Sequence, residues 1–213
     1  MIWKILYYFS LLSTLLPLIG AIRYFKQLDK HQFILFLYAI FLVVVQFFDS
    51  LIVRLGYTNY LFFEGFLIVE LIFFIWFFNR WKPYSKSFLT ASVLFVVILL
   101  IIEYLQYFVY QNLKEVSYTF PLIIIFCIVQ SALMLLKTFD LNDTEFNKNY
   151  VFWIAFARLI YFMAILPFNI YFFIGDDLKG DALEIYTYTD VTINHFANIT
   201  LNTLLMYSFR CRS

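Results

Sequence analysis

The sequence is short of the residues on which a water-soluble domain depends. Only 14% of its 213 residues are charged, 64% are hydrophobic, and the mean hydropathy is +0.84. Soluble domains contain about a quarter charged residues and about half apolar ones, so this chain has more apolar surface than a soluble core can bury. We therefore expect the excess to face lipid.

Charge of one sign, cysteine, histidine and glycine are also rare in the sequence, and each scarcity excludes a class of partner, site or helix packing. The formal net charge is only +1 and no block of five like charges occurs, so nucleic acid is not expected as a partner. The two cysteines, Cys127 and Cys211, form neither a zinc-binding spacing nor a disulfide framework. With two histidines and no cofactor motif, the chain predicts no metal and no cofactor. It has five glycines and no GxxxG, so we expect helices to pack through bulky aromatic side chains.

Apolar segments recur along the chain. An α-helix rises 1.5 Å per residue, so about 20 apolar residues cross the hydrocarbon core of a bilayer. The polar breaks between the segments are short, and none could hold a separate domain. The sequence thus predicts one all-α domain over residues 1–213, a polytopic membrane protein. Its seven transmembrane helices are expected near 5–22, 32–55, 59–79, 88–109, 118–138, 150–174 and 184–209.

The distribution of Lys and Arg between the loops predicts the orientation, because short cytoplasmic loops carry an excess of both. Ten lie on one side of the predicted spans and four on the other, while Arg158 lies inside a span. This places the N-terminus outside and the C-terminus in the cytoplasm, in the cell inner (plasma) membrane. The ten are Arg23, Lys26, Lys30, Arg80, Lys82, Lys86, Lys137, Lys148, Arg210 and Arg212.

The last predicted span carries polar side chains that lipid cannot satisfy. At 100° per residue they fall on one face of the helix, and apolar residues occupy the opposite face. We expect the polar face to meet other helices or a wet cavity. As the plainer alternative, its asparagines serve only in hydrogen bonds between helices. The polar residues are Asp190, Asn194, His195, Asn198 and Asn202.

Carboxyl groups of four spans are predicted at one depth. Counted from the outer ends of the helices, they lie roughly 8–10 Å deep, and Asn169 falls near that level. A charge at the centre of a span costs roughly 2.5–3.5 kcal/mol, so such groups need a partner, water or a ligand. The alternative is solvation at the outer interface. The predicted ligand-binding residues are Asp49, Glu64, Glu103, Asn169, Asp190, Asn194, His195 and Asn198.

Glu70 and Arg158 are expected nearer the middle of the membrane. They come out at compatible depths from opposite ends of their helices. A buried charge of either sign needs a counter-charge in lipid, so we predict an ion pair between them. We interpret this pair as a structural contact between helices, with a catalytic role as the alternative.

Seven spans with an outer N-terminus resemble the layout of small seven-helix receptors and photoreceptors. A retinal protein needs a lysine in its last helix, and 184–209 contains none. The layout is also similar to that of seven-span metal-dependent hydrolases of ceramide, but those use several histidines and His31 lies in a predicted cytoplasmic loop. In its abundance of Phe, Ile, Tyr and Asn the chain resembles small uncharacterised seven-helix bacterial inner-membrane proteins, a resemblance that implies no activity.

These features fit several functions. The one we favour is a ligand-binding or sensory module, which holds a small polar or cationic ligand, or a membrane lipid, and relays to a separate cytoplasmic signalling partner. Alternatives are a transporter, a membrane scaffold subunit and an intramembrane enzyme that modifies lipid, since paired carboxyls can act as acid and base. No catalytic motif supports the enzyme. Its candidate residues would be Asp49, Glu64, Glu103, Asp190 and His195.

Overall fold

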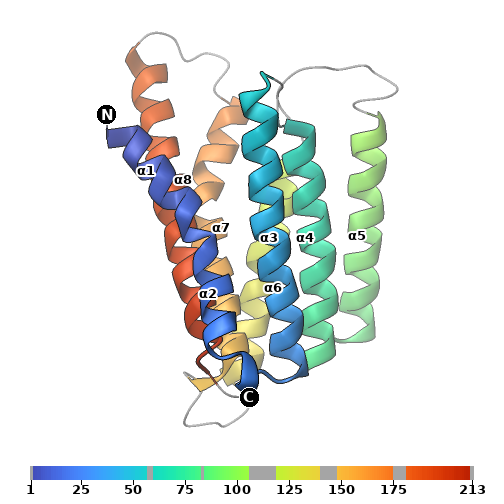
Figure 1. Cartoon of the computed structure of the whole chain (residues 1–213). Helices are drawn as coiled ribbons and strands as arrows, with labels where there is room; N and C mark the ends of the chain where they lie inside the picture. Colours follow the sequence, from blue (N-terminus) through green and yellow to red (C-terminus); the bar gives the residue numbers. More distant parts are fainter. Residues whose placement is uncertain are drawn as a thin grey trace.

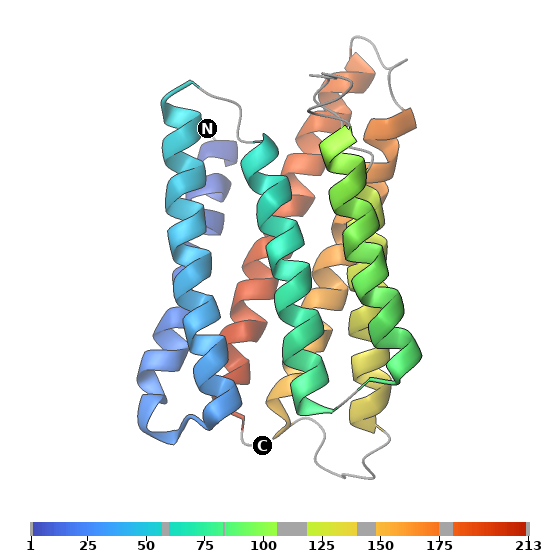
Figure 2. The same cartoon turned by 90° about the vertical axis from the view of Figure 1, so that its right-hand side faces the viewer.

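A computed structural model describes residues 2–56, 60–82, 84–105, 119–139, 148–174 and 181–211, and every regular element in these ranges is helical. The prediction of an all-α fold is therefore confirmed. The helices lie roughly along one common axis, and their direction alternates from α2 to α8, whereas α1 and α2 run in the same direction (Figures 1 and 2). Their bounds are α1 Ile2–Ser13, α2 Leu15–Arg23, η1 Phe25–Gln27, α3 Lys30–Arg54, α4 Tyr60–Trp81, α5 Lys86–Tyr104, α6 Thr119–Phe139, α7 Tyr150–Ile174 and α8 Asp181–Ser208.

The first predicted span is divided between α1 and α2 at Thr14. Pro17 lies four residues after Ser13, so it has no N–H for the Ser13 carbonyl, and its ring crowds that carbonyl. At the break itself, the Thr14 hydroxyl donates to the Leu11 carbonyl at 2.7 Å. Because of this break, α1 packs against α8, whereas α2 packs against both α8 and α3 (Figure 1).

Five helical segments are long and apolar enough to cross a membrane. The surface is correspondingly apolar, since Phe9, Phe47 and Leu136 are each at least 60% exposed. Exposed apolar faces of this kind indicate contact with lipid, and hence a multi-pass membrane protein. Within the residues that the structure describes, α4 and α8 do not belong to these five segments. Each of the two helices contains at least two acidic residues. The five segments are Lys4–Arg23, Lys30–Ile52, Lys86–Tyr104, Thr119–Phe139 and Tyr150–Pro167.

Whereas Lys4 and Arg54 lie at one end of the bundle, most of the described lysines and arginines gather at the other. This end, where α2, α4, α6 and α8 finish, is called the basic end below (Figure 1). Here the Gln32 side chain donates to the Cys211 carbonyl at 2.6 Å, which ties the start of α3 to the chain after α8. Nine residues of the predicted cytoplasmic set lie there: Arg23, Lys26, Lys30, Arg80, Lys82, Lys86, Lys137, Lys148 and Arg210.

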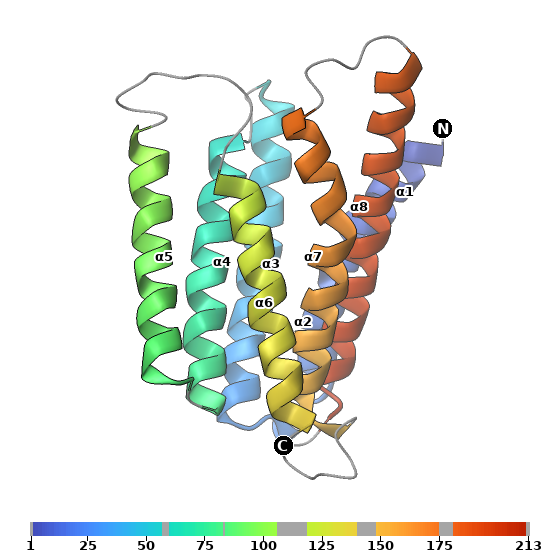
Figure 3. The same cartoon turned by 180° about the vertical axis from the view of Figure 1, so that it is seen from behind.

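The core has two clusters of buried side chains. The first fills the basic end with aromatic residues such as Phe77, Phe78 and Tyr150. The second lies toward the opposite end, between α4, α5, α6 and α7, and includes Leu99 and Phe162. Helix α5 stands at the edge of the bundle and packs mainly against α4 and α6 among the described helices (Figure 3).

Gly20 marks a close contact between α2 and α8, which the expectation of packing through aromatic side chains did not include. A Cβ atom at Gly20 would lie 2.8 Å from Met206 Cγ and 2.9 Å from the Met206 carbonyl oxygen. Real Cβ atoms do not approach other atoms so closely, so only glycine fits here. The two backbones therefore meet directly at this point.

Gly20→Ala should destabilise the protein, because the added methyl group meets the backbone of Met206. Overpacking of this kind costs roughly 1–3 kcal/mol. Gly65→Ala is the matched control, since a Cβ atom at Gly65 of α4 meets nothing within 4 Å. In a helix that control should be neutral or stabilise by about 0.5–1 kcal/mol. Thermal unfolding in detergent measures both, and equal melting temperatures would contradict the close contact.

Candidate functional site

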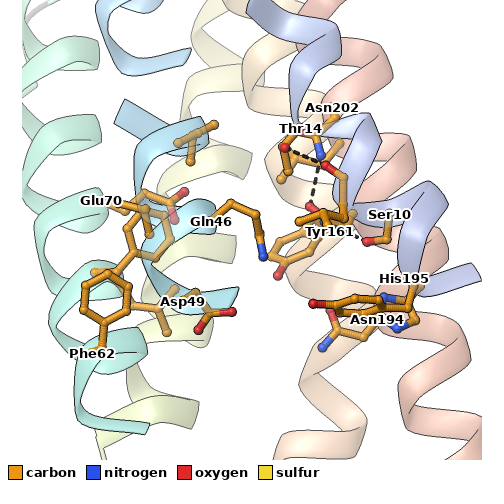
Figure 4. A pocket seen from close by; sticks show the side chains of 18 of the residues that line it. Ser10, Thr14, Gln46, Asp49, Phe62, Glu70, Tyr161, Asn194, His195 and Asn202 are labelled. Atoms are coloured by element: carbon orange, nitrogen blue, oxygen red, sulfur yellow. Dashed lines mark hydrogen bonds between the residues drawn. The ribbon is translucent and has the colours of Figure 1, made fainter. Parts of the chain in front are cut away.

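A cavity of about 410 Å³ separates two groups of helices. Helices α3 and α4 form one wall, and α1, α7 and α8 form the other (Figure 4). The volume lies within the range of small-molecule sites, about 300–1,000 Å³. Helix α2, rather than α1, makes the main contact with α3 beside this cavity. Its polar lining consists of Tyr7, Ser10, Thr14, Tyr38, Gln46, Asp49, Glu70, Tyr161, Asn194, His195, Asn198 and Asn202.

The lining combines negative charge with hydrogen-bonding groups. Gln46 and Asp49 of α3 face Asn194 and His195 of α8 across the cavity (Figure 4). No lysine or arginine is present in the described lining, although it includes two carboxyl groups. The rest of the wall is apolar, with Phe62 among its aromatic side chains. The cavity therefore suits a ligand with a cationic or hydrogen-bonding group beside an apolar part.

Glu70 lies in the cavity wall and is paired with Arg158. Arg158 is only 1% exposed, and its Nη1 group donates to Oε1 of Glu70. Its Nη2 group donates to the Cys127 sulfur at 3.4 Å. The guanidinium carbon lies 3.6 Å from the centre of the Phe74 ring, a favourable cation–π arrangement for a buried guanidinium. The ion pair that the sequence places at mid-membrane thus joins α4, α6 and α7 at the edge of the cavity.

Two asparagines of α8 bind α1 and line the cavity at once. The Asn198 side chain donates to the Ser10 hydroxyl at 2.9 Å. One turn further, Asn202 donates to the Ser13 hydroxyl at 3.0 Å and to Oδ1 of Asn198 at 3.2 Å. Interhelical bonding and cavity lining, which the sequence leaves as alternatives, are therefore combined in these two residues.

The predicted layer of carboxyl groups is divided in the structure. Asp49 lines the cavity, whereas Asp190 is half-buried on α8 and is not part of the lining. Glu103 also lies outside the lining and accepts a hydrogen bond from the Thr119 hydroxyl of α6. Glu103 does not reach the cavity because α5 stands at the edge of the bundle. The side chains that fall outside the described part of the structure are Glu64 and Asn169.

Several lining residues were not among the sequence-based candidates for a ligand site. Gln46 precedes Asp49 by three residues and therefore shares its face of α3, a spacing that the sequence already contains. From the sequence, Glu70 was expected only in the ion pair with Arg158 and not in the ligand site. Tyr38 and Tyr161 carry no such signal, because tyrosine is frequent throughout this chain and also serves at membrane interfaces.

The ion pair should be strongly coupled. Removing one partner leaves the other charge buried and unpaired, so Glu70→Gln and Arg158→Gln should each destabilise the protein by roughly 3–5 kcal/mol. The double substitution should cost less than the sum, because no charge is then left alone. Melting temperatures of the four proteins in one detergent measure the coupling. Additive losses would show that the two side chains do not interact.

Comparison with known proteins adds no relative, since no family model, no curated protein and no solved structure matches this chain.

Proposed function

We propose that this protein is an integral membrane ligand-binding or sensory module whose site is the cavity between α3 and α8. The observation that supports the proposal is the convergence of five helices on one space whose described lining combines amides and hydroxyls with two carboxyl groups, of which Glu70 is paired with Arg158. A carboxylate in such a setting favours a positively charged partner, and the amides and hydroxyls favour a ligand with several polar groups. The ligand class is therefore a small polar or cationic molecule, or a membrane lipid with such a headgroup.

The proposal includes seven spans, with α4 and α8 among them. Helix α4 has 22 residues and α8 has 28, so both are long enough to cross the hydrocarbon core of about 30 Å. Polar residues of both helices make contacts inside the bundle: Glu70 pairs with Arg158, and Asn202 bonds to α1. Helices of polar composition can span a bilayer when these groups are removed from lipid.

The orientation follows from the charge of the bundle ends. The basic end carries nine described Lys and Arg residues, so we assign it to the cytoplasm. The cavity then belongs to the outer half of the inner membrane, since its lining includes Tyr7 near the start of α1 and Asp49 near the end of α3. A signal from the cavity would pass to a separate cytoplasmic partner at the basic end.

Enzymatic use of the carboxyl groups has less support. Acid–base catalysis needs two carboxyl groups close to one substrate. Glu70 is engaged by Arg158, and neither Glu103 nor Asp190 lines the cavity. Binding needs no such pair.

Asp49→Asn should weaken retention of the natural ligand. Replacing a charge-assisted contact by a neutral one costs roughly 1.5–3 kcal/mol, or about 10-fold to 100-fold in affinity. Asp190→Asn makes the same chemical change outside the cavity lining and serves as the control. Native mass spectrometry of the purified proteins measures the fraction with a bound small molecule. Equal retention in the two variants, or no bound molecule in the unchanged protein, would overturn the proposed site.

The orientation has its own test. A reporter that is active only in the cytoplasm should work when it is fused after Ser213. It should be inactive when it is inserted at Lys179, in the predicted last outer loop. The opposite pattern would place the cavity in the cytoplasmic half and refute the assignment of the basic end.

A further inference from the structure

Buried polar side chains lie between the ion pair and the basic end. Gln130 and Ser131 of α6 are both fully buried. Within the part of the chain that the structure describes, neither polar atom of the Gln130 carboxamide has a hydrogen-bond partner, and the Ser131 hydroxyl also has none. The same is true of the Nε atom of Arg158. A buried polar atom without a partner costs about 1–3 kcal/mol, so each is expected to have one.

These side chains form a row of buried polar groups, here called the file, that starts at the Glu70–Arg158 ion pair. Cys127, which accepts from Arg158, precedes Gln130 by three residues and Ser131 by four, so all three lie toward one face of α6. Tyr84 continues the file toward the basic end. Its hydroxyl lies close to Gln130 and within electrostatic range of Arg158, yet it too lacks a partner at hydrogen-bond geometry in the described structure.

The file ends at two lysines of the basic end. The Lys137 ammonium group lies 4.2 Å from the centre of the Tyr84 ring. Lys137 and Lys82 each donate to the main-chain carbonyl of the other at 3.4 Å. Polar groups therefore follow one another from Glu70 in the cavity wall to the lysines at the end of the bundle.

The chemistry of the unpartnered atoms selects the ligand. The Nε–H of Arg158 can only donate, whereas the Gln130 carboxamide and the hydroxyls of Ser131 and Tyr84 can donate and accept. Their common partner must therefore do both. A cation is disfavoured by the guanidinium, and an anion is disfavoured because Glu70 already neutralises Arg158. Water meets these requirements and typically makes about three hydrogen bonds in protein interiors.

We propose that ordered water molecules occupy the interior between α4, α6 and α7 and connect the Glu70–Arg158 pair to Tyr84 and the lysines of the basic end. The hydrated site itself does not depend on the function proposed above. One consequence does rest on that function: a ligand that shifts Glu70 would alter hydrogen bonding along the file and so reach the cytoplasmic end. The file would then be the physical link between the cavity and a partner.

Radiolytic footprinting in lipid nanodiscs with H₂¹⁸O tests the site. Hydroxyl radicals generated from internal water oxidise neighbouring side chains that bulk solvent does not reach. Met134 is fully buried one turn after Gln130 on α6, so it should be oxidised rapidly and acquire ¹⁸O. Leu99→Met supplies an equally buried reporter in the apolar cluster, where oxidation should be at least fivefold slower.

Gln130→Leu removes the polar atoms at nearly constant volume and should lower Met134 oxidation at least threefold, with no change at position 99 in the Leu99→Met background. Ser131→Ala is the milder second variant, should Gln130→Leu not fold. If Met134 is oxidised no faster than the methionine at position 99 in the Leu99→Met protein, the proposal is overturned. Ligand retention is measured separately by native mass spectrometry, so a dry interior with a retained ligand refutes this inference alone.

Discussion

The burial of Arg158 is the constraint on which the arrangement of the helices depends. A guanidinium group stays charged in a protein and cannot be left unpaired in an apolar interior. Arg158 is 1% exposed, so its partners had to come from neighbouring helices: a carboxylate from α4, a sulfur atom from α6 and the aromatic ring of Phe74. These contacts connect α7 with α4 and with α6. They also account for an acidic helix such as α4 in a bundle whose outer faces are apolar.

The two halves of the bundle are built differently. Aromatic side chains fill the basic end, where Gln32 also binds the chain after α8. In the other half, the break at Thr14 turns α1 away from α3. Helix α1 still accepts hydrogen bonds from two asparagines of α8. The close approach at Gly20 holds α2 against α8, so the divergence begins above that contact. One half is therefore closed, and the other contains the cavity.

This arrangement gives the polar residues two tasks at once. Asn198 and Asn202 stabilise the contact with α1 and also present polar atoms to the cavity. Glu70 similarly neutralises Arg158 and contributes to the cavity wall. Since the same groups hold helices together and line the cavity, a molecule bound there would act on helix packing through them. That property suits a sensory module better than a passive scaffold.

The helices themselves were predictable from the sequence, because each one depends on its own run of apolar residues and its own periodicity. The inward face of Asn198 and Asn202 followed from the same periodicity, and the cost of a lone charge in lipid pointed to a pairing of Glu70 with Arg158. Which carboxyl groups line the cavity was decided only by the tertiary structure. Asp49 and Glu103 were predicted at one depth, yet Asp49 lines the cavity, whereas Glu103 of α5 contacts Thr119 of α6 outside the lining. Depth along a helix is a local quantity, whereas the order of helices around a bundle depends on contacts between all of them.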